Sequence, residues 1–341
     1  MAEAKDQFNY RTESGRLKKD GPARLYLLYG EEEYLKEVFQ KEIRDAVFPD
    51  GAVNDFCYRK FSDTDFDRDA FDEAVNALPF LAERILVEVN NCDINKLGED
   101  LLPVVKDLPD YCTVIFRQNS EYVPDFRLKF NKYLRDAYTV FQFAVQPQNV
   151  LDAWIRKRFR AEGKEIGDSA IERLLFLSGV SMNGLIPEIR KIASSVEGET
   201  VGTEDVDRMA HHLPEADVYE MVECIAGGDY KKAFALLSEL LYSRENDPIF
   251  LLSLIGSQFR RIYAAAVARE EGKGAKFLLD AGVVKYDWLA SRLYKTPSRF
   301  STERIGDILV QCADADYKMK SSFADNEEIL KDLLIRISAG A

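Results

Sequence analysis

The sequence predicts an α/β domain over residues 1–146, a small helical domain over 147–213 and a larger helical domain over 214–341. Two observations predict this fold class. Up to Phe143, short apolar runs alternate with segments of helical spacing, a pattern typical of an open parallel sheet with helices on both faces. From Pro147 onward the strand signals disappear and helical patterns follow one another. The 341 residues are sufficient for two or three domains.

The expected strands of the first domain are short apolar or alternating runs, and the expected helices lie between them. We expect strands at 25–29, 55–61, 84–89, 112–117 and 138–143. We expect helices at 31–47, 63–78, 97–106 and 125–135. The second of these helices should turn an apolar face to the sheet, made by Phe66, Ala70, Phe71, Ala74 and Val75.

The second half is expected to contain helices in two groups. The first group is 148–161, 168–177, 185–195 and 203–211, where His211 and His212 read as a polar helix end. The segment 213–216 is expected to be a linker. The second group is 218–225, 230–242, 248–270, 275–281, 285–294, 301–320 and 326–337.

Composition excludes several classes of function. The formal net charge is −13, which argues against a large basic surface for nucleic acid but allows a local basic patch. Five scattered cysteines and two adjacent histidines indicate neither a disulfide framework nor a metal site, and we expect no cofactor. Residues 1–22 lack the apolar core of a signal peptide, and no run approaches the roughly 18 apolar residues that span a bilayer. We therefore expect a soluble, cytoplasmic protein without a membrane partner.

The first expected strand ends at Gly30 in a loop with the outline of a phosphate-binding P-loop. A working P-loop continues with a second Gly for backbone access, a Lys for charge and a hydroxyl for Mg²⁺. In that register this chain offers Leu35, Lys36 and Glu37. Glu31, Glu32 and Glu33 suit a helix N-terminus but would repel a triphosphate. The stretch is either a degenerate P-loop or an ordinary strand-to-helix junction.

The segment Leu78-Pro79-Phe80-Leu81 places large apolar residues directly after a helix-ending proline. Loop tips are usually polar, so an exposed apolar pair at this point indicates a docking wedge. The alternative is that Phe80 and Leu81 fold back into the core before the next strand. The residues by themselves leave both interpretations open.

Several stretches together carry a resemblance to a known family. They are Tyr26-Leu27-Leu28-Tyr29-Gly30-Glu31-Glu32, Leu78-Pro79-Phe80-Leu81-Ala82-Glu83-Arg84, Trp154-Ile155, Val218-Tyr219-Glu220-Met221-Val222 and Gln258-Phe259-Arg260. In order and spacing the chain resembles clamp-loader subunits of the AAA+ class, most closely the delta subunits of bacterial DNA polymerase III. The resemblance covers nearly the whole chain.

The resemblance implies an AAA+-like sheet domain with a degenerate P-loop, a helical lid domain and a C-terminal helical collar domain. It implies a subunit that binds and opens the sliding clamp (the beta subunit) for loading onto primed DNA during replication. The other subunits of its hetero-pentamer would hydrolyse ATP. Asn183 stands where active relatives carry a phosphate-sensing arginine, and no Ser-Arg-Cys arginine-finger triplet occurs. The subunit would have no catalytic site of its own, although it belongs to the DNA polymerase III holoenzyme, a DNA-directed DNA polymerase.

The resemblance also implies sites. It places the clamp contact on Leu78, Phe80 and Leu81. It brings the third domain close to primer-template DNA, where a basic pair beside an aromatic residue, Lys318, Lys320 and Phe323, is a candidate contact. The basic cluster Arg156-Lys157-Arg158 with Arg160 is a comparable candidate on the second domain.

Two other functions remain as alternatives. An active P-loop ATPase would use Gly30 and Lys36, but the third strand runs into Asn90 and Asn91 without the Asp-Glu pair that coordinates a metal. A scaffold or adaptor would use the helical region to bind other partners. Binding to a purified clamp, with ATP binding measured in parallel, separates these functions.

Overall fold

The computed structural model describes residues 8–49, 51, 56–80, 82–243, 246–296 and 299–339, with only the main chain of Glu99. The chain forms two compact units. One is Met1–Gln146 together with Ser181–Asn183, and the other is Pro147–Val180 together with Gly184–Ala341. The separation of a lid domain from a collar domain within the second unit remains a prediction.

The first unit is built on a five-stranded sheet in which every pairing is parallel. The strands are β1 (Leu25–Tyr29), β2 (Tyr58–Ser62), β3 (Ile85–Asn90), β4 (Cys112–Arg117) and β5 (Thr139–Gln142). Their order across the sheet is β2-β3-β4-β1-β5, so β1 lies inside the sheet between β4 and β5. Parallel neighbours require crossovers that cover both faces, which explains why β1 and β3 are buried along their whole length. β1 is apolar throughout, whereas β3 contains two buried polar residues, Glu88 and Asn90.

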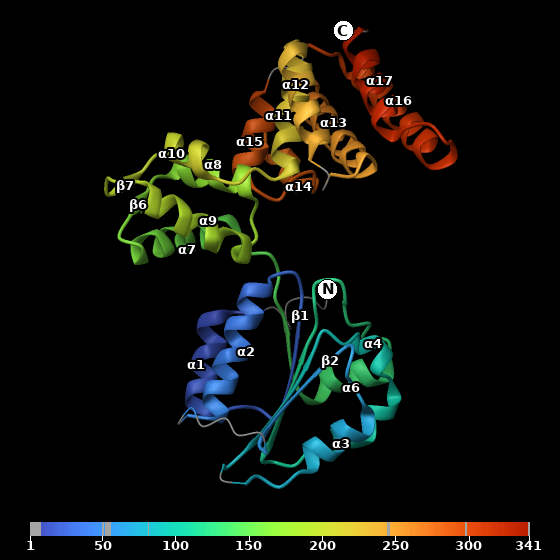
Figure 1. Cartoon of the computed structure of the whole chain (residues 1–341). Coiled ribbons are helices and arrows are strands. Elements are labelled where there is room, and N and C mark those ends of the chain that lie inside the picture. The colour runs from blue at the N-terminus through green and yellow to red at the C-terminus, as the bar shows by residue number, and fades with distance from the viewer. Residues whose placement is uncertain are drawn as a thin grey trace. The chain divides into compact units, whose positions relative to one another are not determined.

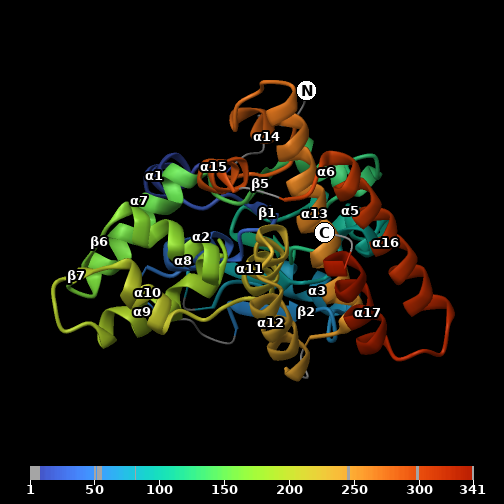
Figure 2. The ribbon, with the colours of Figure 1, turned by 90° about the horizontal axis from the view of Figure 1, so that it is seen from above.

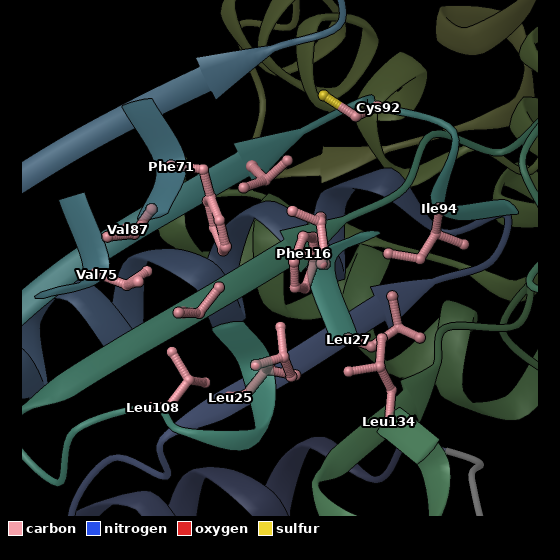
Figure 3. Close-up of a cluster of buried hydrophobic side chains, with 14 of the residues drawn as sticks. Leu25, Leu27, Phe71, Val75, Val87, Cys92, Ile94, Leu108, Phe116 and Leu134 are labelled. Atoms are coloured by element: carbon pink, nitrogen blue, oxygen red, sulfur yellow. The ribbon is translucent and has the colours of Figure 1, made fainter. Parts of the chain in front are cut away.

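Helices cover both faces of this sheet (Figure 1). One face carries α1 (Tyr10–Asp20) and α2 (Glu33–Val47), whose Leu17, Phe39 and Ile43 pack on Tyr26 and Leu28. The alternate residues of β1, Leu25 and Leu27, point to the opposite face. There they join Phe71, Phe116 and Leu134 in a second apolar cluster (Figure 3). This face carries α3 (Arg68–Asn76), α4 (Ile94–Leu97), the 3₁₀ turn η1 (Glu99–Leu101), α5 (Leu102–Lys106) and α6 (Lys129–Ala137).

The predicted fold class is confirmed, with corrections to single elements. Helix α1 was missed because Leu17 is its one buried large apolar residue. The helix expected at 63–78 begins only at Arg68, since Asp67 caps it, and Ala70 is exposed rather than on the inner face. The helix expected at 97–106 is divided at Gly98, whose φ of 70° lies in the left-handed region that favours glycine.

The second unit begins with the helices α7 (Gln148–Ala161), α8 (Asp168–Ser178), α9 (Met182–Ser195) and α10 (Thr203–Met209). It also contains a two-residue parallel pair, β6 (Glu165–Ile166) with β7 (Thr200–Val201), which the sequence did not predict. Pairs this short have no periodicity that a sequence pattern could reveal.

The remaining helices follow in the predicted order and close the chain. The expected linker at 213–216 is wrong, because Pro214 starts a helix, a position where its missing N–H is tolerated. Helices α16 and α17 lie side by side (Figures 1 and 2). The elements are α11 (Pro214–Gly227), α12 (Tyr230–Tyr242), α13 (Pro248–Glu270), α14 (Lys276–Asp280), α15 (Asp287–Lys295), α16 (Thr302–Ser321) and α17 (Asn326–Ala339). No helix in the described part of the chain is long and apolar enough to cross a membrane.

Candidate functional site

The Gly30 loop follows β1 and is held tightly against the segment that follows β5. Gly30 has a φ of 117°, and a Cβ at this position would lie 2.5 Å from the carbonyl oxygen of Phe143. That same oxygen accepts a hydrogen bond of 3.0 Å from the N–H of Glu32. The N–H of Phe143 donates to the carbonyl of Tyr29 at 2.7 Å. Only glycine allows this approach of two backbones, so Gly30 is required by the sheet itself.

Lys36 is completely buried beneath this loop. Its ammonium donates to the carbonyl oxygens of Gly30 at 2.7 Å and Gln118 at 2.6 Å, and to Oε1 of Glu33 at 2.7 Å. An ammonium has three protons, and here each has an acceptor within the protein. Burial lowers the pKa of Lys36, and the hydrogen bond to Glu33 acts in the opposite direction.

The positions of the second glycine and of the hydroxyl are also occupied by residues with structural contacts. Leu35 packs its side chain against the apolar cluster of the α1 and α2 face. Glu37, at the position of the hydroxyl, accepts a hydrogen bond of 3.3 Å from Arg117. The Gly30 loop and the first turn of α2 are therefore engaged in contacts with each other and with the segments that follow β4 and β5.

The glutamates at the start of α2 differ from the expected row of exposed charges. Glu33 is committed to Lys36, and Glu32 is buried. Burial raises the pKa of Glu32 to about 7, so it is only partly ionised at neutral pH. The three glutamates therefore do not act as three free carboxylates toward an anion.

The end of β3, where an ATPase carries its metal-binding acids, is polar but engaged in the core. The Asn90 Oδ1 atom accepts a hydrogen bond of 3.0 Å from Nε2 of Gln40. Buried Glu88 accepts two bonds from Arg44 Nη2, at 2.8 and 2.9 Å, and one of 2.9 Å from the Tyr58 hydroxyl. These contacts join Arg44 of α2 and Tyr58 of β2 to Glu88 of β3, so the Glu88 carboxylate is engaged within the fold.

The loop before β3 presents apolar side chains to solvent. The side chains of Leu78 and Phe80 are 78% and 59% exposed, so Phe80 does not fold back into the core. Leu81 lies outside the described residues. Buried Cys57 holds the main chain of Phe80, since its Sγ accepts from the Phe80 N–H at 3.3 Å and donates to the Phe80 carbonyl at 3.2 Å.

Sequence reasoning missed Phe56, which belongs to this surface. Phe56 is 69% exposed, and its ring meets that of Phe80 edge to face at a centroid distance of 5.9 Å. The sequence pattern assigned Phe56 to a strand, but β2 begins at Tyr58. Phe56 and Phe80 both precede parallel strands, whereas the Gly30 loop follows one. The surface with Phe56 and Phe80 therefore lies at the N-terminal ends of the parallel strands, and the Gly30 loop lies at their C-terminal ends.

The predicted DNA-contact residues lie at the end of α16 and in the turn to α17. Lys318 and Phe323 are exposed, and Phe323 is fully open to solvent. Lys320 forms an ion pair of 2.8 Å with Asp316 on its own helix. In the second basic cluster, Arg156 pairs with Asp168 and Arg160 with Glu165. The structure thus leaves Lys318 and Phe323 as the more open members.

Comparison with known proteins decides the family. The family described as DNA polymerase III, delta subunit, matches residues 26–144, and the C-terminal domain of the same subunit matches residues 215–337. The chain belongs to the DNA polymerase III delta subunit family. A curated relative from Bacillus subtilis, DNA polymerase III subunit delta, is 27% identical over 336 residues, which is 94% of each chain.

Two further comparisons place this delta subunit among its relatives. The probable DNA polymerase III subunit delta of Aquifex aeolicus is 24% identical over 182 residues, 53% of this chain and 52% of that protein. The solved structure of the Bacillus subtilis DNA clamp loader delta protein matches with a TM-score of 0.54 and 24% identity. The match covers 96% of this chain and 99% of that chain, and it shows that the two chains share a fold.

Proposed function

We propose that this delta subunit binds the sliding clamp through Leu78, Phe80 and Leu81 and opens it for loading onto primed DNA. The observation that carries the proposal is the exposure of Phe80 beside Leu78 on a loop whose main chain is fixed by Cys57. Exposing a large apolar side chain to water is unfavourable, and the free energy falls when a partner buries that side chain. Membership of the family supplies the class of partner, the clamp and the other subunits of a clamp loader.

The expected strength suits a contact that forms and breaks in each loading cycle. Burying Phe80 and one large neighbour contributes about 3–6 kcal/mol before the costs of association. The fixed main chain of Phe80 lowers one of those costs, since less conformational freedom is lost on binding.

We also propose that the subunit does not hydrolyse ATP and relies on neighbours in a hetero-pentamer for that reaction. The three acceptors on the Lys36 ammonium support this, because a phosphate would have to displace one of them. The side chains of Leu35 and Glu37 support it as well. So does Asn183, which falls in the proposed lid domain of residues 147–213 although Ser181–Asn183 group with the first unit. In the proposed collar domain, residues 214–341, Lys318, Lys320 and Phe323 would face primer-template DNA.

The test is binding of the full chain to a purified sliding clamp. We expect the double variant Phe80→Ala/Leu81→Ala to bind at least about 100-fold more weakly than wild type, since 1.4 kcal/mol is a factor of ten. Val123→Ala is the matched control, because Val123 is an exposed apolar residue of the same unit. Unchanged affinity in the double variant would disprove the wedge. Saturable binding of Mg·ATP, measured in parallel, would instead support the alternative function, an active P-loop ATPase.

A further inference from the structure

Phe56 and Phe80 come from different segments and form one aromatic pair. Their ring centroids lie 5.9 Å apart at an interplanar angle of 68°, an edge-to-face arrangement. Each of the two residues nevertheless keeps more than half of its surface exposed. A pair that served only to stabilise the fold would bury these rings, as the aromatic residues of the two sheet clusters do.

The position of Phe56 is fixed by the sheet. The carbonyl of its neighbour Cys57 accepts a hydrogen bond of 2.9 Å from the N–H of Leu86 on β3, directly before the register pair of Tyr58 with Leu86. The Cys57 thiol in turn holds both main-chain polar groups of Phe80. Buried Cys57 thus holds the main chain of Phe80 and is itself bonded to β3 next to Phe56.

We propose that Phe56 is a direct clamp-contact residue, which packs against the sliding clamp together with Phe80. The inference rests on the proposed function. Phe56, Leu78 and Phe80 are all exposed at the edge of the sheet that precedes its strands, so the surface of Phe80 continues onto Phe56. A partner that covers Phe80 would leave the adjoining Phe56 ring half in water unless it covered Phe56 as well. The main chain at Phe80 and beside Phe56 is held by hydrogen bonds and loses little freedom on binding, which favours joint burial of the two residues.

The experiment measures the Kd of the full chain for the purified clamp. We expect Phe56→Ala to weaken binding about tenfold, the effect of a buried interface aromatic. Phe56→Leu should keep most of the affinity, because it retains an apolar side chain. Tyr242→Ala is the control, since Tyr242 is an exposed aromatic on α12 of the other unit. Because Phe56 and Tyr242 are exposed, we expect each of these variants to have the thermal unfolding midpoint of the wild type.

Repeating the Phe56→Ala change in a Phe80→Leu chain separates two roles of Phe56, direct contact with the clamp and positioning of Phe80. In a Phe80→Leu chain the ring pair is absent. If Phe56 contacts the clamp directly, adding Phe56→Ala to this chain should still weaken binding about tenfold. If Phe56→Ala weakens binding only while Phe80 is present, Phe56 positions Phe80 and the inference is wrong. If Phe56→Ala binds like wild type while Phe80→Ala/Leu81→Ala does not, the inference fails and the wedge stands. If neither variant loses affinity, the proposed function fails together with the inference.

Discussion

Lys36 shows how a single retained residue changes its role when its surroundings change. In a working P-loop the lysine faces a phosphate. Here its charge is satisfied by two backbone carbonyls and the Glu33 carboxylate. The carbonyl of Gln118 follows β4, the strand next to β1, so Lys36 joins the ends of two neighbouring strands. Its role in the fold is to hold these ends and the first turn of α2 together.

We expect Lys36→Met to lower the free energy of unfolding by about 2–4 kcal/mol, because it leaves buried acceptors without their donor. Urea denaturation followed by circular dichroism measures this loss. Lys41→Met on the same helix is the control, since Lys41 is exposed and its replacement should change stability little. Equal stability of the two variants would contradict the structural role of Lys36.

At the scale of elements, α16 and α17 form a hairpin whose turn carries the most exposed aromatic side chain among the described residues, Phe323. The last turn of α16 adds Tyr317 and Lys318, which are also exposed. An aromatic ring and an ammonium at the tip of a helical hairpin suit a nucleic-acid end, where a base stacks and a phosphate is neutralised. The overall charge of −13 implies that such a contact works only locally.

In the assembled clamp loader we expect Phe323→Ala to weaken primer-template binding about five- to tenfold, since stacking on an aromatic contributes ~1–3 kcal/mol per base. Lys318→Ala should weaken it more than Lys320→Ala, because Lys320 is already paired with Asp316. Fluorescence anisotropy with labelled DNA at two salt concentrations measures both effects. Wild-type affinity in both Phe323→Ala and Lys318→Ala would exclude this hairpin as the DNA contact.

The elements that the sequence predicted best are those whose pattern alone decides their structure. The apolar run of β1 and the long helices α12 and α13 have the predicted bounds. Elements that depend on tertiary contacts were missed or misplaced. Helix α1 is mostly polar and lies on the α2 face, while β6 and β7 exist only because they pair with each other. Propensity and periodicity contain no information about such pairing.

At the scale of the whole molecule, the same distinction governs the candidate site. Gly30, Lys36 and the apolar loop at Phe80 could be proposed from sequence, because each matches or departs from a known local pattern. Phe56, Gln118 and the Cys57 anchor could not, because each acts through a residue far away in the chain. The sequence thus predicts individual residues of the Gly30 loop and of the Phe80 loop. The contacts between these residues and distant parts of the chain become visible only in the folded structure.

The buried ammonium of Lys36 also has a consequence for chemical labelling. Acyl-phosphate derivatives of ATP modify lysines whose amine is accessible and has a free lone pair. We expect such a reagent to modify exposed Lys18 and Lys41 in the folded chain and to leave Lys36 untouched until the protein is denatured, as read by mass spectrometry of its peptides. A proteome-wide search that finds nucleotide-binding proteins by their acylated P-loop lysine would pass over this chain, although its sequence keeps a lysine at that position.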